Sequence, residues 1–331
     1  MNETQTVIDL AAYLDFGTPA QAGSLTLIPM LAPETATAAA PAYLLYQQAH
    51  EARLLTVEEV SESGSVGELR VANRANQPVL LVEGEVLLGM KQTRVLNITI
   101  LVPAQTVLLV PVSCVESGRW RAVSEEAIGK AAAHLAPSVR AAKTVTVARS
   151  MRSAMTFDSD QQAVWTGVDR ILDGHGTDAP SRSYADLVVD TTALIDLART
   201  ITPAPRQLGV LALVAGHVSC VDIFESPRVL AALWSGLLAS YQAEALVTRD
   251  GEVRRAGERD EAAARRWFRS IAGGSASIGP EIGLGAHVTV VAPHVEVAAL
   301  VAGGRVVHLS AFPAHNAATP TRFVRPARRR S

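Results

Sequence analysis

The feature that most constrains the fold is a series of short apolar segments in the first third of the chain, which recur roughly every ten residues. They are rich in valine and leucine, and glycine, proline or asparagine stands between them, as is typical of turns. The segments span residues 54–60, 66–73, 79–88, 94–102 and 106–115, and a similar one spans residues 24–33. Short strands packed this densely predict an antiparallel sandwich or a partly closed barrel.

The pattern changes after Trp120, where apolar residues begin to follow helical spacing. The predicted helices span residues 124–136, 139–152, 161–172, 184–198 and a segment that begins at Pro227. Strands return as a predicted hairpin over residues 208–224 and as three segments between residues 287 and 311. The predicted fold class is α+β, with an N-terminal β-sandwich or barrel-like antiparallel region followed by a helix-rich α+β region.

Four parts of the chain follow from these boundaries. They are a flexible N-terminus (1–23), a β-rich region that carries the polar motifs (24–121), an α+β region (122–315) and a basic tail (316–331). The tail has five arginines between Arg322 and Arg330, whereas the whole chain has 30 basic and 32 acidic residues and a formal net charge of −2. Broad nucleic-acid binding needs a basic field, so this balance argues against it, apart from a weak contact by the tail.

Cysteine usage and hydropathy indicate a soluble cytoplasmic protein. Cys114 and Cys220 are the two cysteines of the chain, so neither a disulfide framework nor a CxxC metal pair is expected. The N-terminal residues lack the basic and apolar segments of a secretory signal. No apolar run reaches the roughly 20 residues that a membrane-spanning helix needs. We therefore expect reduced thiols and no membrane partner.

Two of the predicted strands end in segments that are crowded with charged and polar side chains. The first motif, residues 78–94, contains Glu83, Glu85, Lys91, Gln92 and Arg94, and the second motif, residues 112–120, contains Cys114, Glu116, Arg119 and Trp120. Rigid strands that lead into glycine-punctuated polar segments are suited to hold a functional site. We therefore expect the two motifs to meet in one hollow.

The carboxylates of the first motif are two residues apart, so an unbroken strand would place Glu83 and Glu85 on the same face. Adjacent carboxylates repel each other, and Lys91 and Arg94 are the nearby cations that could neutralise them. Such an arrangement would suit acid–base chemistry or a metal ion. The alternative is a solvent-facing strand surface on which the charges are loosely paired.

The second motif also has a functional and a structural interpretation. Cys114, which shares a strand face with Glu116, is either a small buried residue or a nucleophile whose pKa is lowered by Arg119. Arg94 and Arg119 could each grip a phosphate or a carboxylate. Trp120 could stack on a planar ring or close the end of the sheet.

Other sequence patterns give less support for a particular chemistry. The eight histidines form no HxxH or HExxH pattern, so no metal site is predicted. The chain has no GxGxxG after a strand and no GxxxxGK[ST], so the cofactor stays unassigned. Cys220 is expected in the core. Asp222, near Phe224 at the end of the predicted hairpin, is either a solvated strand-end carboxylate or a partner that faces the first motif.

The motifs also resemble a known family. The segments Glu83–Glu85, Gly89–Asn97, Val102-Pro103 and Val112–Trp120 are similar to the bacterial ARG and Rhodanese-Phosphatase-superfamily-associated protein domain, in which ARG denotes ADP-ribosylglycohydrolase. Where the family pattern reads GAKQNR, this chain has Met90 and Thr93. The resemblance covers roughly residues 24–250 and implies a link to nucleotide or NAD-derived metabolism. The matching positions are Glu85, Lys91, Gln92, Arg94, Cys114, Glu116, Arg119 and Trp120.

Two main hypotheses of function follow. In the first, the protein binds or processes a phosphorylated small molecule, such as an ADP-ribose- or NAD-related compound. Lys91, Gln92, Arg94, Arg119 and Trp120 would bind this ligand, and Glu85 or Glu116 would act as the acid–base group.

In the second hypothesis, the protein is a non-catalytic protein-interaction module whose motifs are architectural. This hypothesis predicts that Glu85→Gln and Arg94→Ala both lower the melting temperature. A further alternative is a transferase or phosphatase that uses Cys114 as its nucleophile. Whether the protein is an enzyme stays open.

Overall fold

The computed structural model describes residues 2–34, 40–60, 67–88, 91–118, 131–177, 180–189, 201–247 and 254–314. The elements up to residue 114 are α1 (Glu3–Tyr13), β1 (Asp15–Phe16), β2 (Ala20–Ala22), β3 (Leu25–Leu31), β4 (Leu44–Leu45), α2 (Tyr46–Glu51), β5 (Leu55–Glu59), β6 (Glu68–Asn73), β7 (Val79–Leu81), β8 (Glu85–Leu87), β9 (Arg94–Leu96), β10 (Ile100–Val102) and β11 (Thr106–Cys114). The later elements are β12 (Ala131–His134), α3 (Pro137–Ala154), α4 (Gln161–His175), α5 (Tyr184–Val189), β13 (Gln207–Val214), β14 (His217–Phe224), α7 (Pro227–Leu246), α8 (Glu258–Arg269), the 3-10 helix η2 (Ser270–Gly273), β15 (Ser275–Ile278), β16 (Ala286–Ala292), β17 (Val295–Ala302) and β18 (Arg305–Pro313). The predicted α+β class is confirmed.

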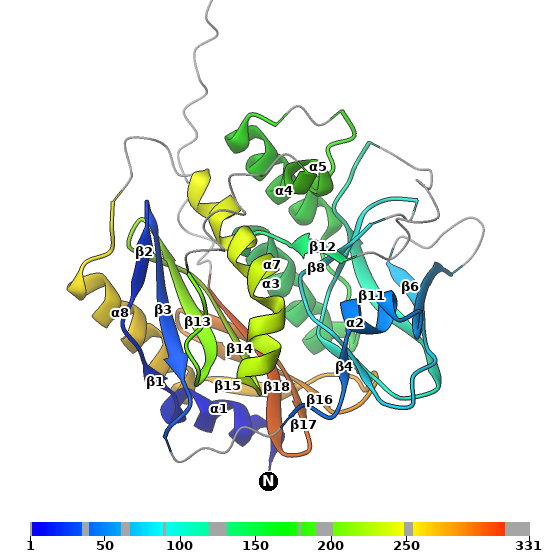
Figure 1. Ribbon diagram of the computed structural model, residues 1–331, viewed down its shortest axis with the longest axis horizontal. Coiled ribbons are helices and arrows are strands. Elements are labelled where there is room, and N and C mark those ends of the chain that lie inside the picture. The colour runs from blue at the N-terminus through cyan, green and yellow to red at the C-terminus, as the bar shows by residue number, and fades with distance from the viewer. Residues whose placement is uncertain are drawn as a thin grey trace, which may run out of the picture.

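One large antiparallel sheet joins strands from both ends of the chain (Figure 1). Among the described residues its strands follow the order β1-β3-β13-β14-β18-β17-β16-β15, and β2 pairs with β3. The pairing of β3 with β13 runs from Leu31 opposite Gln207 to Leu25 opposite Val214. The early strand β3 therefore belongs to the same sheet as the last strands of the chain.

Two smaller sheets form the strand-rich region between residues 44 and 134. The first follows the order β12-β8-β9-β11-β6-β5, and the second follows the order β10-β7-β4, in which β4 and β7 are parallel. Buried residues such as Leu69, Leu81, Leu96 and Val110 from both sheets pack in one apolar core. This core fixes the position of the turns that carry the first motif.

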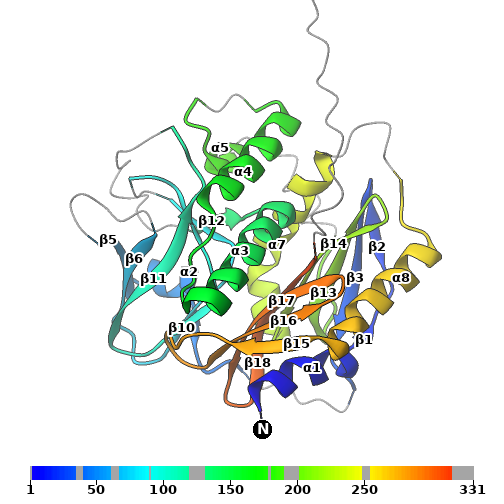
Figure 2. The same ribbon diagram turned by 180° about the vertical axis from the view of Figure 1, so that it is seen from behind.

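Helices α3 and α7 lie between the large sheet and the smaller sheets in both ribbon views (Figures 1 and 2). Leu230, Leu237 and Tyr241 of α7 pack with Ala212 of the large sheet and Leu80 of a smaller one. Helices α1 and α8 cover the other face of the large sheet. None of the helices in the described ranges combines the length and the apolar character needed to cross a membrane.

Residues 3–13 form helix α1, although the sequence placed them in a flexible N-terminus. The Asn2 side chain caps this helix by accepting a hydrogen bond from the Thr4 backbone N–H at 3.2 Å. Val7 and Ala11 are buried in the core beneath the large sheet. The apolar residues are spaced four apart, so a single stripe of α1 docks on the sheet.

Three local predictions differ from the structure. The predicted strand over residues 79–88 is divided into β7 and β8, and the one over residues 94–102 is divided into β9 and β10. The helix predicted over residues 124–136 is wrong for its described part, because Ala131–His134 form strand β12 and pair with β8. Alanine has the highest helix propensity of all residues, but propensity is a weak determinant, and pairing with a neighbouring strand overrides it here.

Candidate functional site

A turn between β7 and β8 separates the two carboxylates of the first motif. Glu83 lies in the turn, and Glu85 is the first residue of β8. Gly84 between them has a φ of +86°, and a Cβ at this position would lie 2.8 Å from Nε of Arg140. Glycine therefore fits the tight approach of α3 to the turn. Because the strand is broken here, the alternation that would place both carboxylates on one face does not apply.

The cations beside Glu83 come from helix α3. Nε and Nη2 of Arg140 donate to Oε2 of Glu83 at 3.0 and 2.7 Å, and Nζ of Lys143 lies 2.8 Å from Oε1. Burial alone would raise the pKa of Glu83, but Arg140 and Lys143 outweigh it and lower the pKa to about 2. Glu83 is thus ionised and held by Arg140 and Lys143, rather than by Lys91 and Arg94 as the sequence suggested.

Arg140 also binds Asp222 of β14, on the opposite side from Glu83. Nη1 and Nη2 of Arg140 donate to the two oxygens of Asp222 at 3.0 and 2.6 Å, and the Tyr241 hydroxyl donates to Asp222 Oδ2 at 2.5 Å. Burial would raise the pKa of Asp222, but Arg140 and His308 hold it well below its usual range. The suggestion that Asp222 faces the first motif is confirmed, with Arg140 as the bridge.

His308 and Thr99 complete this buried group. His308 Nε2 lies 3.6 Å from Asp222 Oδ1, and its Nδ1 lies 2.6 Å from the Thr99 hydroxyl. The Thr99 hydroxyl in turn accepts a hydrogen bond from the Glu83 backbone N–H at 2.9 Å. We call this group the central cluster: Glu83, Thr99, Arg140, Lys143, Asp222, Tyr241 and His308. It connects a smaller sheet, helices α3 and α7, and the large sheet.

Glu85 occupies a different environment from Glu83. Its Oε2 accepts a hydrogen bond from the Val82 backbone N–H at 2.8 Å, and its pKa is shifted by burial rather than by a neighbouring charge. Burial raises the pKa of Glu85 to about 8, and the Val82 hydrogen bond opposes this shift only in part. Glu85 is therefore mainly a neutral carboxylic acid at pH 7, two residues from an ionised Glu83.

The end of the first motif meets the second motif across strands β9 and β11. Arg94 is paired with Cys114 in the strand register, and its Nη1 donates to the Cys114 sulfur. Arg94 Nη2 lies 3.8 Å from Oε1 of Glu59. Burial raises the pKa of Cys114 to about 11 even though Arg94 opposes the shift. Cys114 is therefore a protonated thiol at neutral pH, which disfavours it as a nucleophile.

Glu116 also joins the two motifs. Its Oε2 accepts hydrogen bonds from the backbone N–H and the hydroxyl of Thr93, both at 2.9 Å, and Gln92 donates to its backbone oxygen at 3.0 Å. The Thr93 hydroxyl lies 3.2 Å from that of Ser183. We call Gln92, Thr93, Arg94, Cys114 and Glu116 the motif junction. The meeting of the two motifs is thus observed for these residues, and Glu83 and Glu85 have other partners.

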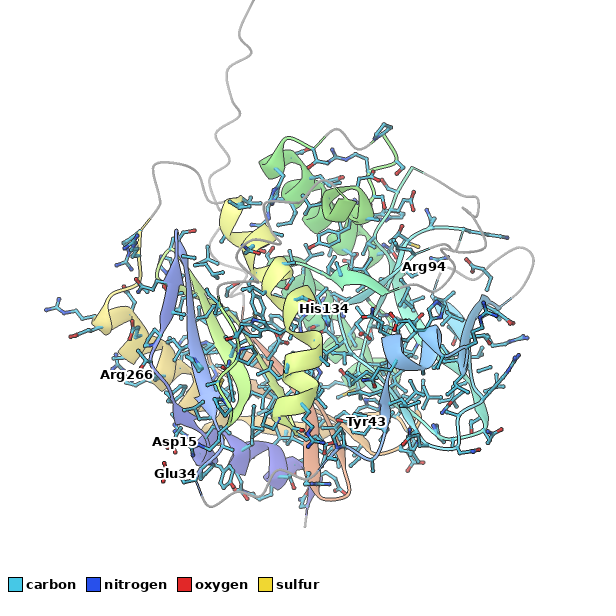
Figure 3. All side chains as sticks on the ribbon, viewed as in Figure 1. Asp15, Glu34, Tyr43, Arg94, His134 and Arg266 are labelled. Atoms are coloured by element: carbon cyan, nitrogen blue, oxygen red, sulfur yellow. The ribbon has the colours of Figure 1, made fainter. Side chains whose placement is uncertain are left out.

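The remaining predicted site residues lie at or beyond the edge of the motif junction. Lys91 is partly exposed, and its backbone N–H donates to Glu59 Oε1 at 3.1 Å. Arg119 and Trp120 lie outside the described residues, as does the basic tail. Figure 3 shows Arg94 among the strands of the smaller sheets. Within the described ranges, no three His, Cys, Asp or Glu side chains are grouped so that they could hold a metal ion.

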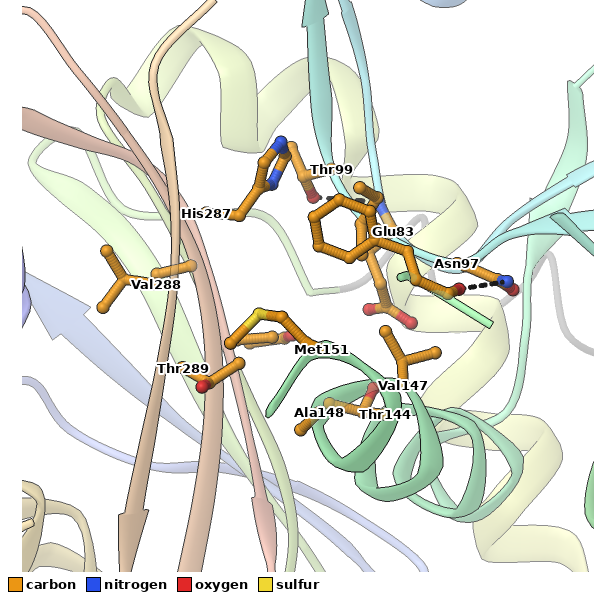
Figure 4. Close-up of a pocket in the computed structure, with 15 residues that line it drawn as sticks. Glu83, Asn97, Thr99, Thr144, Val147, Ala148, Met151, His287, Val288 and Thr289 are labelled. Atoms are coloured by element: carbon orange, nitrogen blue, oxygen red, sulfur yellow. Dashed lines mark hydrogen bonds between the residues drawn. The ribbon is translucent and has the colours of Figure 1, made fainter. Parts of the chain in front are cut away.

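A small cavity lies beside Glu83, between α3 and strands β16 to β18 (Figure 4). Its volume is about 30 Å³, which is room for roughly two water molecules. The hydroxyls of Thr144, Thr289 and Ser310 line it, and none of the three has a hydrogen-bond partner among the described protein groups. A cavity of this size, with these hydroxyls in a mainly apolar lining, has room to hydrate a buried carboxylate but is too small for a nucleotide.

The cations of the central cluster were not found from the sequence, although a signal exists. Arg140 and Lys143 are three residues apart on a helix whose other buried positions include Val139, Val147 and Met151. Two basic residues on the apolar stripe of a helix need buried counter-charges, because an unpaired buried charge is costly. Their spacing therefore points to acidic partners elsewhere in the core.

The fold and the two buried groups define an α+β protein whose sequence motifs are built into the contacts within and between its sheets. The family model of the ARG and Rhodanese-Phosphatase-superfamily-associated Protein domain (ARPP-1) matches residues 13–312, and the chain belongs to this family. The resemblance inferred from the motifs is confirmed. No curated protein and no solved structure matches the chain.

Proposed function

We propose that the chain is a non-catalytic interaction module in which the two motifs maintain the fold. The observation that carries this proposal is burial: Glu83, Glu85, Gln92, Arg94, Cys114 and Glu116 are each at most 5 % exposed. Polar groups that are buried and bonded to other protein groups rigidify a core, and they are not available to a ligand without rearrangement. Binding would then take place on another part of the surface.

The Arg94→Ala variant tests this proposal. Removal of the guanidinium would take a cationic neighbour from the Cys114 thiol and the Glu59 carboxylate, so we expect a loss of about 1–3 kcal/mol in the free energy of unfolding. Denaturant unfolding followed by circular dichroism measures this change. Arg170→Ala is the matched control, because Arg170 is 44 % exposed and pairs with Glu244 at the surface. Equal stability of both variants would contradict an architectural role for Arg94.

A second candidate is the binding or processing of a phosphorylated small molecule, such as an ADP-ribose- or NAD-related compound. It is favoured by the meeting of the two motifs at the motif junction and by the partly exposed Lys91 beside it. Lys91, Gln92, Arg94 and Arg119 would neutralise the phosphates, and Trp120 would stack on the base. In a catalytic version of this candidate, Glu85 or Glu116 would be the acid–base group, or Cys114 the nucleophile.

Isothermal titration with ADP-ribose, NAD and AMP tests the second candidate. We expect saturable binding that is weakened about tenfold by Lys91→Ala, since a charged hydrogen bond to phosphate is lost. Adenosine, which lacks the phosphate, should bind more weakly than AMP. Absence of binding by all three phosphorylated compounds at millimolar concentration would remove this candidate and leave the interaction module.

A further inference from the structure

Helix α1 passes below one end of the large sheet (Figure 1). A broad groove lies between this helix and the edges of the strands above it. Its walls come from α1, the start of β13, the end of β14 and the turn between β17 and β18. The groove has a volume of about 760 Å³, which is within the range of roughly 300–1,000 Å³ that is usual for small-molecule sites. None of its lining residues belongs to either motif.

The floor of the groove is apolar and its rim carries an aromatic side chain. Leu10, Leu208, Ile223 and Val306 contribute the apolar surface. Tyr13 at the C-terminal end of α1 is 49 % exposed. A half-exposed tyrosine beside an apolar floor can stack on a planar group and hydrogen-bond through its hydroxyl.

Among the described residues, two arginines of the groove have loose carboxylate partners. Arg206 Nη2 lies 3.7 Å from Glu34, which is itself 89 % exposed, and Arg305 Nε lies 3.9 Å from Glu225. Both distances exceed that of a normal hydrogen bond. The Arg206–Glu34 pair is exposed, and pairs of this kind contribute little. Glu225, by contrast, is only 9 % exposed, although the Arg305 side chain itself is 65 % exposed. The Arg206 side chain is positioned by a 2.8 Å hydrogen bond from Nη1 to the Ala32 carbonyl. Arg206 could therefore exchange its partner for a ligand anion at small cost, and the exposed Arg305 could bind an anion while it stays near Glu225.

The acidic residues of the groove limit the charge of the ligand. Asp9 and Glu225 line the groove together with Arg206 and Arg305, so its charges balance. Asp9 accepts a 2.7 Å hydrogen bond from Gln5 on the same helix. A polyanion would meet strong repulsion from these two carboxylates, whereas a single anionic group would meet less repulsion and could still bind a guanidinium.

We propose that this groove binds a small amphipathic anion. The ligand has an apolar or aromatic body that lies on the floor beside Tyr13, and one phosphate or carboxylate group that binds Arg206 or Arg305. This inference goes beyond the roles proposed for the motifs, because it uses a different surface. If the chain is an interaction module, as proposed above, this groove would also let it bind a small molecule of this chemical class.

A pair of fluorescent probes tests the proposal on the full chain. 1-Anilinonaphthalene-8-sulfonate has an aromatic body and one anionic group, and N-phenyl-1-naphthylamine has nearly the same body without the charge. We expect saturable binding of the sulfonate, weakened about tenfold or more in the Arg206→Ala/Arg305→Ala double variant, with little change for the neutral probe. Each single variant then shows which arginine holds the anion. Tyr13→Ala should weaken both probes.

Arg266→Ala is the matched control, because Arg266 is an exposed arginine of α8 that does not line the groove (Figure 3). Binding of the sulfonate should be the same in this variant as in the wild type. The proposal is overturned if the sulfonate does not bind saturably, or if the double variant binds it as tightly as Arg266→Ala does. It is also overturned if the double variant loses both probes equally while its melting temperature matches that of the wild type.

Competition identifies the anionic group. 1-Naphthyl phosphate and 1-naphthoate share an aromatic body and differ in the anion. Displacement of the sulfonate probe mainly by one of them assigns the groove to phosphates or to carboxylates. Displacement by neutral 1-naphthol as strong as by either anion would overturn the anionic class.

Discussion

The central cluster and the motif junction are both buried, but their charges are paired in different ways. In the central cluster, Arg140 forms close ion pairs with Glu83, in the turn between β7 and β8, and with Asp222, in β14 of the large sheet. In the motif junction, Glu116 and Gln92 bond mainly within neighbouring segments, and Arg94 has a sulfur and a carboxylate 3.8 Å away as neighbours. The central cluster therefore fixes how the sheets are placed relative to each other, and the motif junction fixes one sheet locally.

The largest expected effect is that of Arg140→Met. This change removes the cation between Glu83 and Asp222 while keeping an apolar chain of similar length. Two buried carboxylates would then lack their main partner, which typically costs about 3–5 kcal/mol. The free energy of unfolding from urea titration measures the loss.

The triple variant Glu83→Gln/Arg140→Met/Asp222→Asn sharpens this test. It removes the carboxylate charges that Arg140→Met leaves unpaired, so it should recover part of the lost stability. If Arg140→Met alone is no less stable than Arg170→Ala at the surface, the central cluster does not join the sheets in the way described. The proposed difference between the central cluster and the motif junction would then be wrong.

The next effect is a pH dependence that distinguishes Glu85 from Glu83. The pKa of Glu85 is raised from 4.5 to about 8 in the folded protein. The stability that comes from its protonated form is therefore fully present below about pH 4.5 and is lost as the pH rises through 8. Glu83 behaves oppositely: its pKa is lowered from 4.5 to about 2, so its contribution is lost as the pH falls through that range.

Glu85→Gln isolates the first of these contributions. Glutamine can still accept the hydrogen bond from Val82 but cannot ionise. Between pH 5 and pH 8 the wild type should lose stability relative to Glu85→Gln, by up to about 1.4 kcal/mol per pH unit for one proton. The architectural hypothesis from the sequence predicts a loss of stability in Glu85→Gln. The raised pKa of Glu85 makes any such loss largest at acidic pH and smaller as the pH rises through 8. If the difference in stability between the wild type and Glu85→Gln does not change with pH across this range, Glu85 is not a neutral acid in the folded protein.

Local patterns were sufficient to predict many of the elements. The hairpin of β13 and β14 is confirmed, and its turn uses Ala215 and Gly216 with φ of 49° and 81°. Helix α7 begins at Pro227 as predicted. The position of β3 in the large sheet could not be predicted in this way, because an apolar strand does not specify its distant partner. The division of the chain into domains stays a prediction.

The motifs led to only part of the buried site. The contact of Arg94 with Cys114 follows from two motifs on neighbouring strands, which a sequence comparison can suggest. The partners of Glu83 could not be read from the motifs, because Arg140 and Lys143 belong to a later helix. A search of the predicted helices for charged residues at buried positions would have found Arg140 and Lys143.

The smallest expected effect concerns the reactivity of Cys114. It is fully buried, burial raises its pKa to about 11, and it is paired with Arg94 in the motif junction. In the Cys220→Ala variant, iodoacetamide at pH 7.5 should therefore label Cys114 only when the protein unfolds, so the labelling rate should rise with urea along the unfolding curve. Peptide mass spectrometry measures the labelled fraction. Rapid labelling of the folded protein would mean that the motif junction opens to solvent without unfolding of the whole protein, and it would restore Cys114 as a candidate nucleophile.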